Sequence, residues 1–128
     1  NPKLMDIVVP KNKKHGVPLE NQMRSNGINV QQLKTMMNQK KVKLIDVRED
    51  FEIQRDGLIE KSIQVPYTQI ENFFQNIELS QSTDQFVLYC HSGQRTYLAL
   101  QKLKNSNIYH LAGGILNWLE AGESVRRT

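Results

Sequence analysis

Short apolar segments alternate along the chain with segments whose apolar residues recur at helical spacing. Strands are predicted over residues 42–47, 62–66, 86–89 and 108–111. Helices are predicted over residues 30–41, 49–55, 68–77, 96–104 and 114–122. Because strands and helices take turns, the sequence predicts an α/β fold around a mainly parallel sheet.

Individual residues sharpen three of these helices. Asn29 is the predicted N-cap of the first, since its short polar side chain precedes the apolar spacing. Thr68 is expected to cap the helix that carries Ile70 and Phe74. Phe51 is expected to face the core from the short helix over residues 49–55.

The first 27 residues lack this regularity. Prolines, glycines and a lysine-rich run interrupt them, so an irregular basic arm or linker is predicted over residues 1–27 and a single domain over residues 28–128. Residues 1–43 hold nine Lys or Arg against two Asp or Glu, whereas the whole chain carries a net charge of +4. Such an arm suits an acidic partner, but without interleaved aromatic residues it favours a solvated leader over a nucleic-acid site.

Cysteine and histidine usage limits the chemistry. Cys90 is the one cysteine, so an internal disulfide and a Cys-rich zinc site are excluded, and the three histidines have no metal-ligand spacing. No metal and no cofactor are expected. The chain has no apolar run of membrane-spanning length and no signal-peptide pattern, so a cytoplasmic location is predicted. The first residue is Asn1 rather than Met, which is compatible with an excised domain of a larger protein, a trimmed sequence or a processed chain.

The most informative stretch surrounds Cys90. A buried strand over residues 86–89 leads into a short polar loop with Gly93 and Arg95, and a helix follows. The first amides of a helix have no intrahelical partner, and the helix dipole is positive there, so the site favours an anion such as a thiolate. A lone cysteine is more often a small buried hydrophobe. Here it ends its apolar run and enters a polar loop, which favours an activated nucleophile.

The residues at this loop resemble a known family. Cys90-His91-Ser92-Gly93-Gln94-Arg95-Thr96 is similar to the Cys-x-x-Gly-x-Arg-Ser/Thr loop of rhodanese-like sulfurtransferases. Residues 44–49, residues 57–66 and Leu111-Ala112-Gly113-Gly114 followed by Trp118 resemble further motifs of that family, in the right order. The match covers roughly residues 29–126. It departs at Leu58, where the family has histidine, and over residues 60–62.

The resemblance implies a fold and a reaction. It implies a central parallel sheet of about five strands with helices on both faces. It also implies sulfane-sulfur transfer through a Cys90 persulfide, with thiosulfate or a persulfide as donor and a thiol, cyanide or a carrier protein as acceptor. The loop that would bind the persulfide and an anionic donor comprises His91, Ser92, Gly93, Gln94, Arg95 and Thr96.

Roles within the loop follow from its position. Arg95 is open to two interpretations, an anchor for an anionic donor or an ion pair that closes the loop. His91, Ser92 and Gln94 are expected to act mainly through the backbone, with their side chains at the rim. Asp46 and Arg48, at the end of the strand over residues 42–47, are interpreted as structural, because buried ions need partners.

Three other functions compete. The sequence of residues 46–55 faintly resembles that of rhodanese domains that follow an adenylyltransferase and pass sulfur to a small carrier protein. A non-catalytic regulatory module is a second alternative, although such modules often lack the cysteine. A cysteine-dependent phosphatase is disfavoured, because such enzymes resemble Cys-x5-Arg and this loop has four residues between Cys90 and Arg95.

Overall fold

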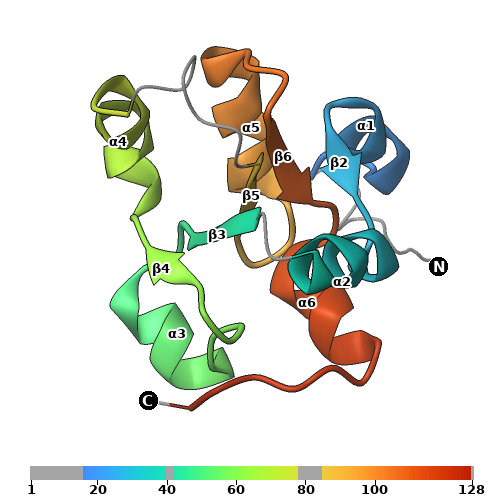
Figure 1. Ribbon diagram of the computed structural model, residues 1–128. Helices are drawn as coiled ribbons and strands as arrows, with labels where there is room; N and C mark the ends of the chain where they lie inside the picture. The colour runs from blue at the N-terminus through green and yellow to red at the C-terminus, as the bar shows by residue number, and fades with distance from the viewer. Residues whose placement is uncertain (1–15, 40–41, 78–84, 128) are drawn as a thin grey trace, which may run out of the picture.

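The computed structural model describes residues 16–39, 42–77 and 85–127. Figure 1 shows the elements within these residues. In chain order they are α1 Leu19–Arg24, β2 Gly27–Ile28, α2 Val30–Asn38, β3 Val42–Asp46, α3 Asp50–Asp56, β4 Ile63–Gln64, the 3₁₀ helix η2 Tyr67–Gln69, α4 Ile70–Gln75, β5 Gln85–Tyr89, α5 Gln94–Leu103, β6 Ile108–Leu111 and α6 Gly114–Glu120.

The five strands form one parallel sheet in the order β2-β6-β5-β3-β4. The longest pairing joins β3 to β5 and sets Asp46 opposite Tyr89. This confirms the predicted α/β fold and the five-stranded parallel sheet. The carboxyl ends of β3 and β5 therefore lie side by side, and Cys90 begins the loop at this edge.

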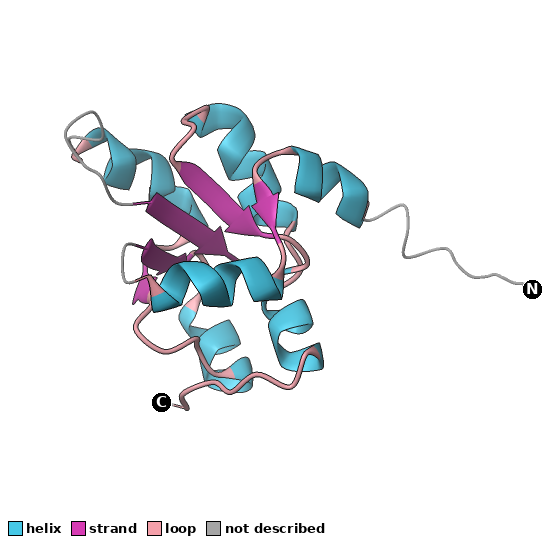
Figure 2. Ribbon diagram, turned by 45° about the vertical axis from the view of Figure 1, so that its right-hand side comes forward, coloured by secondary structure: helices cyan, strands magenta, loops and turns pink. Residues whose placement is uncertain are grey.

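Side chains of β5 alternate between two cores, as the strand period requires. Phe86 and Leu88 join one apolar cluster, which includes residues of α4 and α5 and also Cys90. Val87 and Tyr89 join the other, which includes residues of α2 and α6. Figure 2 shows helices on both faces of the strands, as the family resemblance implied.

Three predictions about single helix residues can be compared with the structure. Asn29 is the N-cap of α2, with a reciprocal capping box to Gln32, so that prediction is confirmed. Thr68 does not cap α4: it lies inside η2, which follows Pro66, and Gln69 occupies the cap position without a side-chain bond. The prediction for Phe51 is also wrong, since its side chain is 65% exposed while Glu52 and Ile53 are buried.

The sequence predicted irregular chain over residues 1–27, but the structure has α1 within that range and β2 beginning at its last residue. β2 pairs with β6, setting Gly27 opposite His110 and Ile28 opposite Leu111. A strand of two residues after a six-residue helix gives no periodic pattern that a sequence could show. Residues 1–15 of the predicted arm lie outside the described residues.

Candidate functional site

Cys90 follows the last residue of β5, at the carboxyl end of the central strand. Its sulfur accepts a hydrogen bond of 3.1 Å from the backbone amide of Gly93, which is the N-cap of α5. The residue is 1% exposed. The sulfur therefore lies beneath the loop that connects β5 to α5, at the amino end of a ten-residue helix.

Gly93 gives the loop its turn. Its φ is +91°, in the left-handed region, and its carbonyl accepts from Tyr97 N as α5 begins. A Cβ at this position would collide with the side-chain amide of Gln22. Glycine is thus required here both by the backbone conformation and by the close approach of α1.

Thr96 places a hydroxyl beneath the sulfur from the first turn of α5. Its Oγ1 lies 3.7 Å from Cys90 Sγ, 3.3 Å from the Gly93 carbonyl oxygen and 2.8 Å from His110 Nδ1. Thr96 and His110 are both fully buried. Burial lowers the pKa of His110, an effect that its hydrogen bond with the Gln22 carbonyl partly offsets. The ring is therefore neutral at neutral pH when it is considered alone.

Gln22 of α1 holds the loop from the side. Its side-chain amide donates to the carbonyls of Val17 and Ser92, and its Oε1 accepts from Gly113 N at 2.8 Å. Gln22 is buried, and these bonds satisfy its side chain, as a buried polar group requires. Sequence reasoning missed both Gln22 and His110. The signal for His110 was present, because it stands in an apolar strand and a buried imidazole needs partners.

The start of α6 fixes the loop backbone from a third direction. Ile115 N donates to the Cys90 carbonyl and Leu116 N donates to the His91 carbonyl. Gly114, with φ +65°, leaves room for this contact, since a Cβ there would meet the backbone of His91. The Gly113-Gly114 pair therefore serves packing at the loop.

Arg95 forms a two-pronged ion pair with Glu52 of α3, at 2.9 and 2.6 Å. The Arg95 side chain is 30% exposed and the Glu52 side chain 8%. The hydrogen bond from Arg95 lowers the pKa of Glu52 to about 2, against the opposing effect of burial. Of the two interpretations of Arg95, the structure shows the ion pair that closes the loop.

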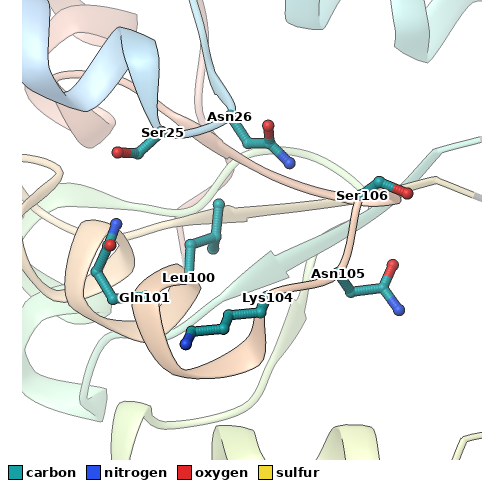
Figure 3. A pocket seen from close by; sticks show the side chains of 7 residues that line it. All are labelled: Ser25, Asn26, Leu100, Gln101, Lys104, Asn105 and Ser106. Carbon is teal, nitrogen blue, oxygen red and sulfur yellow. The ribbon is translucent and has the colours of Figure 1, made fainter.

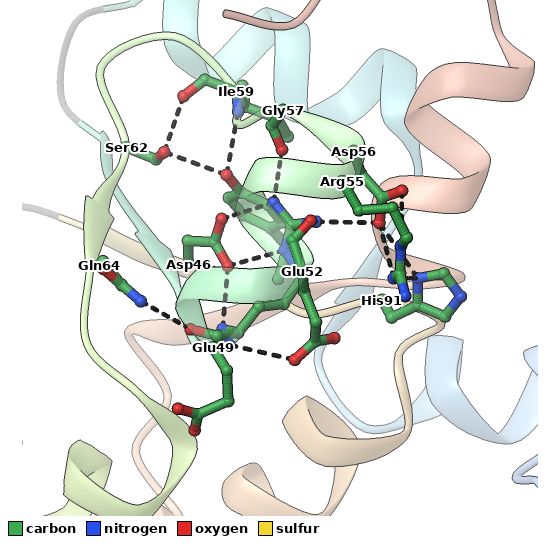
Figure 4. Close-up of polar contacts among 12 residues, drawn as sticks. Asp46, Glu49, Glu52, Arg55, Asp56, Gly57, Ile59, Ser62, Gln64 and His91 are labelled. Carbon is green, nitrogen blue, oxygen red and sulfur yellow. Dashed lines mark hydrogen bonds and ion pairs between the residues drawn. The ribbon is translucent and has the colours of Figure 1, made fainter. Parts of the chain in front are cut away.

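A second ion pair lies beneath α3, and Figure 4 shows its surroundings. Asp46 accepts from the Arg48 side chain at 3.0 and 2.8 Å, and both residues are fully buried. Arg48 also donates to the Gly57 carbonyl and to Asp56. Burial alone would lower the pKa of Arg48, but the hydrogen bond and charge of Asp46 outweigh it and raise that pKa. These contacts fit the structural interpretation of both residues.

The side chains of His91 and Gln94 have their bonding partners away from the sulfur. His91 lies at the rim, where its Nδ1 is 3.4 Å from Arg55 and 3.7 Å from Asp56 (Figure 4). The Gln94 side chain bonds the backbone of Val17. Within the described residues, Cys90 Sγ accepts a hydrogen bond from Gly93 N and shares one with Thr96 Oγ1, in which either atom can donate. Among the described residues, Gly93 supplies the one backbone amide that bonds the sulfur.

A hollow of about 270 Å³ lies elsewhere. Figure 3 shows the side chains that line it. It is lined by Ser25 and Asn26, which precede β2, and by residues 104–106, which precede β6, together with Leu100 and Gln101 of α5. It thus opens at the amino ends of these strands, opposite the Cys90 edge of the sheet. Apart from Leu100 the side chains around it are polar, and Lys104 is the one titratable group among them.

The described residues contain no cluster of three or more His, Cys, Asp or Glu side chains that could hold a metal ion. Within the same residues, no helix is long and apolar enough to cross a membrane.

Comparison with known proteins identifies the family. The model of the rhodanese-like domain matches residues 29–121, most of the chain. This chain belongs to the rhodanese-like domain family. The mouse thiosulfate sulfurtransferase/rhodanese-like domain-containing protein 3 is 30% identical over 107 residues, which cover 73% of this chain and 68% of the mouse protein. An uncharacterized Synechocystis protein, slr1261, is 34% identical over 100 residues, covering 75% of this chain and 53% of that protein.

Solved rhodanese structures share the fold. A rhodanese-related protein from Thermoplasma volcanium superposes with a TM-score of 0.62 at 28% identity, covering 77% of this chain and 95% of that one. The human single-domain sulfurtransferase TSTD1 gives a TM-score of 0.61 at 22% identity over 74% of this chain and 96% of its own. Membership in this rhodanese-like family supports sulfur transfer in general.

Proposed function

We propose that this rhodanese-like domain transfers sulfane sulfur through a persulfide on Cys90. The observation that carries the proposal is the position of the Cys90 sulfur at the carboxyl end of β5, where it accepts a hydrogen bond from Gly93 N at the start of α5. An amide and a helix N-terminus stabilise negative charge on sulfur, both as thiolate and as persulfide. The family supplies the reaction class.

The reaction proceeds in two steps that share one intermediate. The Cys90 thiolate attacks the outer sulfur of thiosulfate, a new S–S bond forms, and the original S–S bond breaks with loss of sulfite. An acceptor nucleophile, such as a thiol or cyanide, then attacks the outer sulfur, the S–S bond to Cys90 breaks, and the Cys90 thiolate is regenerated. This is covalent catalysis of the ping-pong type.

The loop residues from His91 to Thr96 serve as the cradle for the persulfide. Gly93 contributes its amide and Thr96 its hydroxyl, since these two groups already contact the sulfur. Arg95 contributes a fixed positive charge that Glu52 holds in place. Because Cys90 is 1% exposed, a small donor with a terminal sulfur suits the site better than a bulky disulfide.

The same geometry disfavours a phosphatase. A phosphoryl group needs an arginine fork free to bind its oxygens, together with several converging amides. Here both prongs of Arg95 bind Glu52, and four residues separate Arg95 from Cys90. A single sulfur atom requires much less of the loop.

Intact-mass measurement after exposure to thiosulfate tests the proposal. The wild type should gain the mass of one sulfur atom, a reductant should remove it, and Cys90→Ala should gain none. Because the chain has one cysteine, the gain is assigned to Cys90 directly. If neither thiosulfate nor a small-molecule persulfide adds sulfur to the folded wild type, the transferase proposal is wrong and a regulatory role is favoured.

A further inference from the structure

A buried series of hydrogen bonds leads away from the Cys90 sulfur. Thr96 Oγ1 lies 3.7 Å from Cys90 Sγ and 2.8 Å from His110 Nδ1. The other ring nitrogen, Nε2, lies 3.1 Å from the carbonyl oxygen of Gln22. Cys90, Thr96 and His110 are each at most 1% exposed, so bulk solvent does not compete for these groups.

The Gln22 carbonyl fixes the proton on the ring. A carbonyl oxygen only accepts, so His110 Nε2 must carry the proton of that bond. In a neutral imidazole Nδ1 then has a lone pair, and the Thr96 hydroxyl must donate to it. Thr96 has a single hydroxyl proton, and the 2.8 Å contact with His110 is shorter than its 3.3 Å contact with the Gly93 carbonyl. The remaining lone pairs of Thr96 are left to accept a proton from the Cys90 thiol.

A second complete arrangement exists, in which the hydrogen bonds that join His110 Nδ1, Thr96 and Cys90 run in the opposite direction. With His110 protonated at both nitrogens, Nδ1 donates to Thr96, the Thr96 hydroxyl donates to the sulfur, and the sulfur is a thiolate. The bond from Nε2 to the Gln22 carbonyl is unchanged. Every donor thus has an acceptor in both arrangements, and the two differ by the shift of two protons, one from the sulfur to Thr96 and one from Thr96 to His110.

We propose that His110, acting through Thr96, takes the proton of the Cys90 thiol as the thiolate forms. The S–H bond breaks as that proton passes to Thr96 Oγ1, while the Thr96 hydroxyl proton moves to His110 Nδ1. The result is a thiolate and an imidazolium, with no net change of charge and no further reactant. His110 is a positioning residue here, because it reaches the sulfur only through Thr96. The inference rests on the proposed function only in taking Cys90 as the nucleophile.

The charged side chains named below, on the helices near His110, have partners elsewhere, so Cys90 is the group coupled to His110. On α1, Glu20 and Arg24 pair with each other at the surface. On α5, Arg95 turns to α3 and the Lys102 ammonium lies over the ring of Tyr67. The effects that shift the pKa of His110 are burial, which lowers it, and the bond with the Gln22 carbonyl, which raises it. A buried imidazolium without a charged neighbour is unfavourable, so His110 is expected to charge only together with the thiolate.

The pH dependence of Cys90 alkylation by iodoacetamide tests this coupling. In the wild type the thiolate appears while the proton is still held on His110. His110→Gln and Thr96→Val should each move the midpoint of the rate profile upward by about one pH unit and lower the rate at pH 7 about tenfold. Thr96→Ser keeps the hydroxyl and should retain the wild-type profile. A merely structural role would change the rate by one factor at all pH values, and an unmoved midpoint in both variants would overturn the proposal.

A measurement on the wild-type fold covers the case in which a variant fails to fold. Nitrogen chemical shifts of ¹⁵N-histidine should show His110 protonated at both nitrogens at the pH where the alkylation profile shows that the Cys90 thiolate forms. In Cys90→Ala the same ring should be neutral, with its proton on Nε2. A neutral ring in both proteins at every pH above 6 would contradict the proposal.

The two proposals fail separately. Alkylation and chemical shifts require no sulfur donor, so a moved midpoint without sulfur uptake from thiosulfate would leave the coupling standing and remove the transferase. Sulfur uptake with an unmoved midpoint would support the transferase and overturn the coupling.

Discussion

Two walls hold the Cys90 loop, and they are built from different chemistry. The α3 wall consists of Glu52 and its ion pair with Arg95, with Asp56 at the rim beside His91. The wall opposite, the α1 wall, consists of Gln22, Thr96 and His110, joined by hydrogen bonds without a fixed charge. The α3 wall is partly exposed and the α1 wall is buried.

The difference shows how stability and chemistry can be divided at one site. A pair of charges at a partly exposed position depends on pH and is weakened by salt. A buried hydrogen bond between neutral groups does not depend on pH or salt. Removal of one partner lowers the free energy of unfolding more, because the remaining partner is buried without water to bond. We therefore expect the two walls to respond differently to substitution and to pH.

The largest effect is expected at the α1 wall. Gln22→Ala removes the partner of the Ser92 and Val17 carbonyls and of Gly113 N, so the free energy of unfolding should fall by about 2–3 kcal/mol. Urea denaturation measures this loss, and sulfur uptake should slow in the folded protein because the loop loses a support. Asn21→Ala, at an exposed neighbouring position on α1, should change stability by less than about 0.5 kcal/mol. Equal losses in both variants would show that Gln22 has no special role.

A smaller and pH-dependent effect is expected at the α3 wall. Glu52→Gln should lower the free energy of unfolding by about 1–2 kcal/mol at pH 7, a value reduced by the partial exposure of Arg95. The pKa of Glu52 lies near 2 in the folded protein and at an ordinary value near 4.5 when unfolded. The contribution is therefore complete above about pH 4.5 and is lost as pH falls toward 2.

Urea denaturation at several pH values between 7 and 3 compares the walls directly. The gap between wild type and Glu52→Gln should shrink below about pH 4.5, whereas the gap caused by Gln22→Ala should stay constant. Glu71→Gln, at an exposed position on α4, is the matched charge control. A constant gap for Glu52→Gln would mean that the carboxylate charge contributes nothing to the α3 wall.

The smallest effect is expected at His91. Its imidazole contacts Arg55 and Asp56 at the rim and the sulfur only through the chain that carries it. His91→Ala should change the rate of sulfur uptake less than about threefold, because a general base would contribute at least about a hundredfold. Stopped-flow measurement of sulfite release gives the rate. A hundredfold fall with an intact fold would make His91, rather than the α1 wall, the partner of the thiol.

Much of the fold and the centre of the site could be predicted from the sequence. The alternation of strands and helices was visible because each strand is a short apolar run, and Cys90 stood at the junction of a strand and a helix. The loop motif and its companions then indicated the family. These features are local, so neighbouring residues alone reveal them.

The walls could not be predicted, because each depends on partners far apart in the chain. Phe51 was expected to face the core, but Glu52 is buried instead, because Arg95 supplies the partner that its carboxylate needs. Gln22 sat in a basic leader without apolar periodicity. The strand next to it, β2, has two residues and is defined by its pairing with β6 rather than by its own composition.

The position of Gln22 has a practical consequence for anyone who moves this domain into another protein. The family match begins at residue 29, so a graft cut at that border would leave α1 and β2 behind. The transplanted piece would keep Cys90 and every loop residue, yet β6 would become an open edge, and the carbonyl of Ser92 would face solvent. A border before residue 17 would carry both walls across intact.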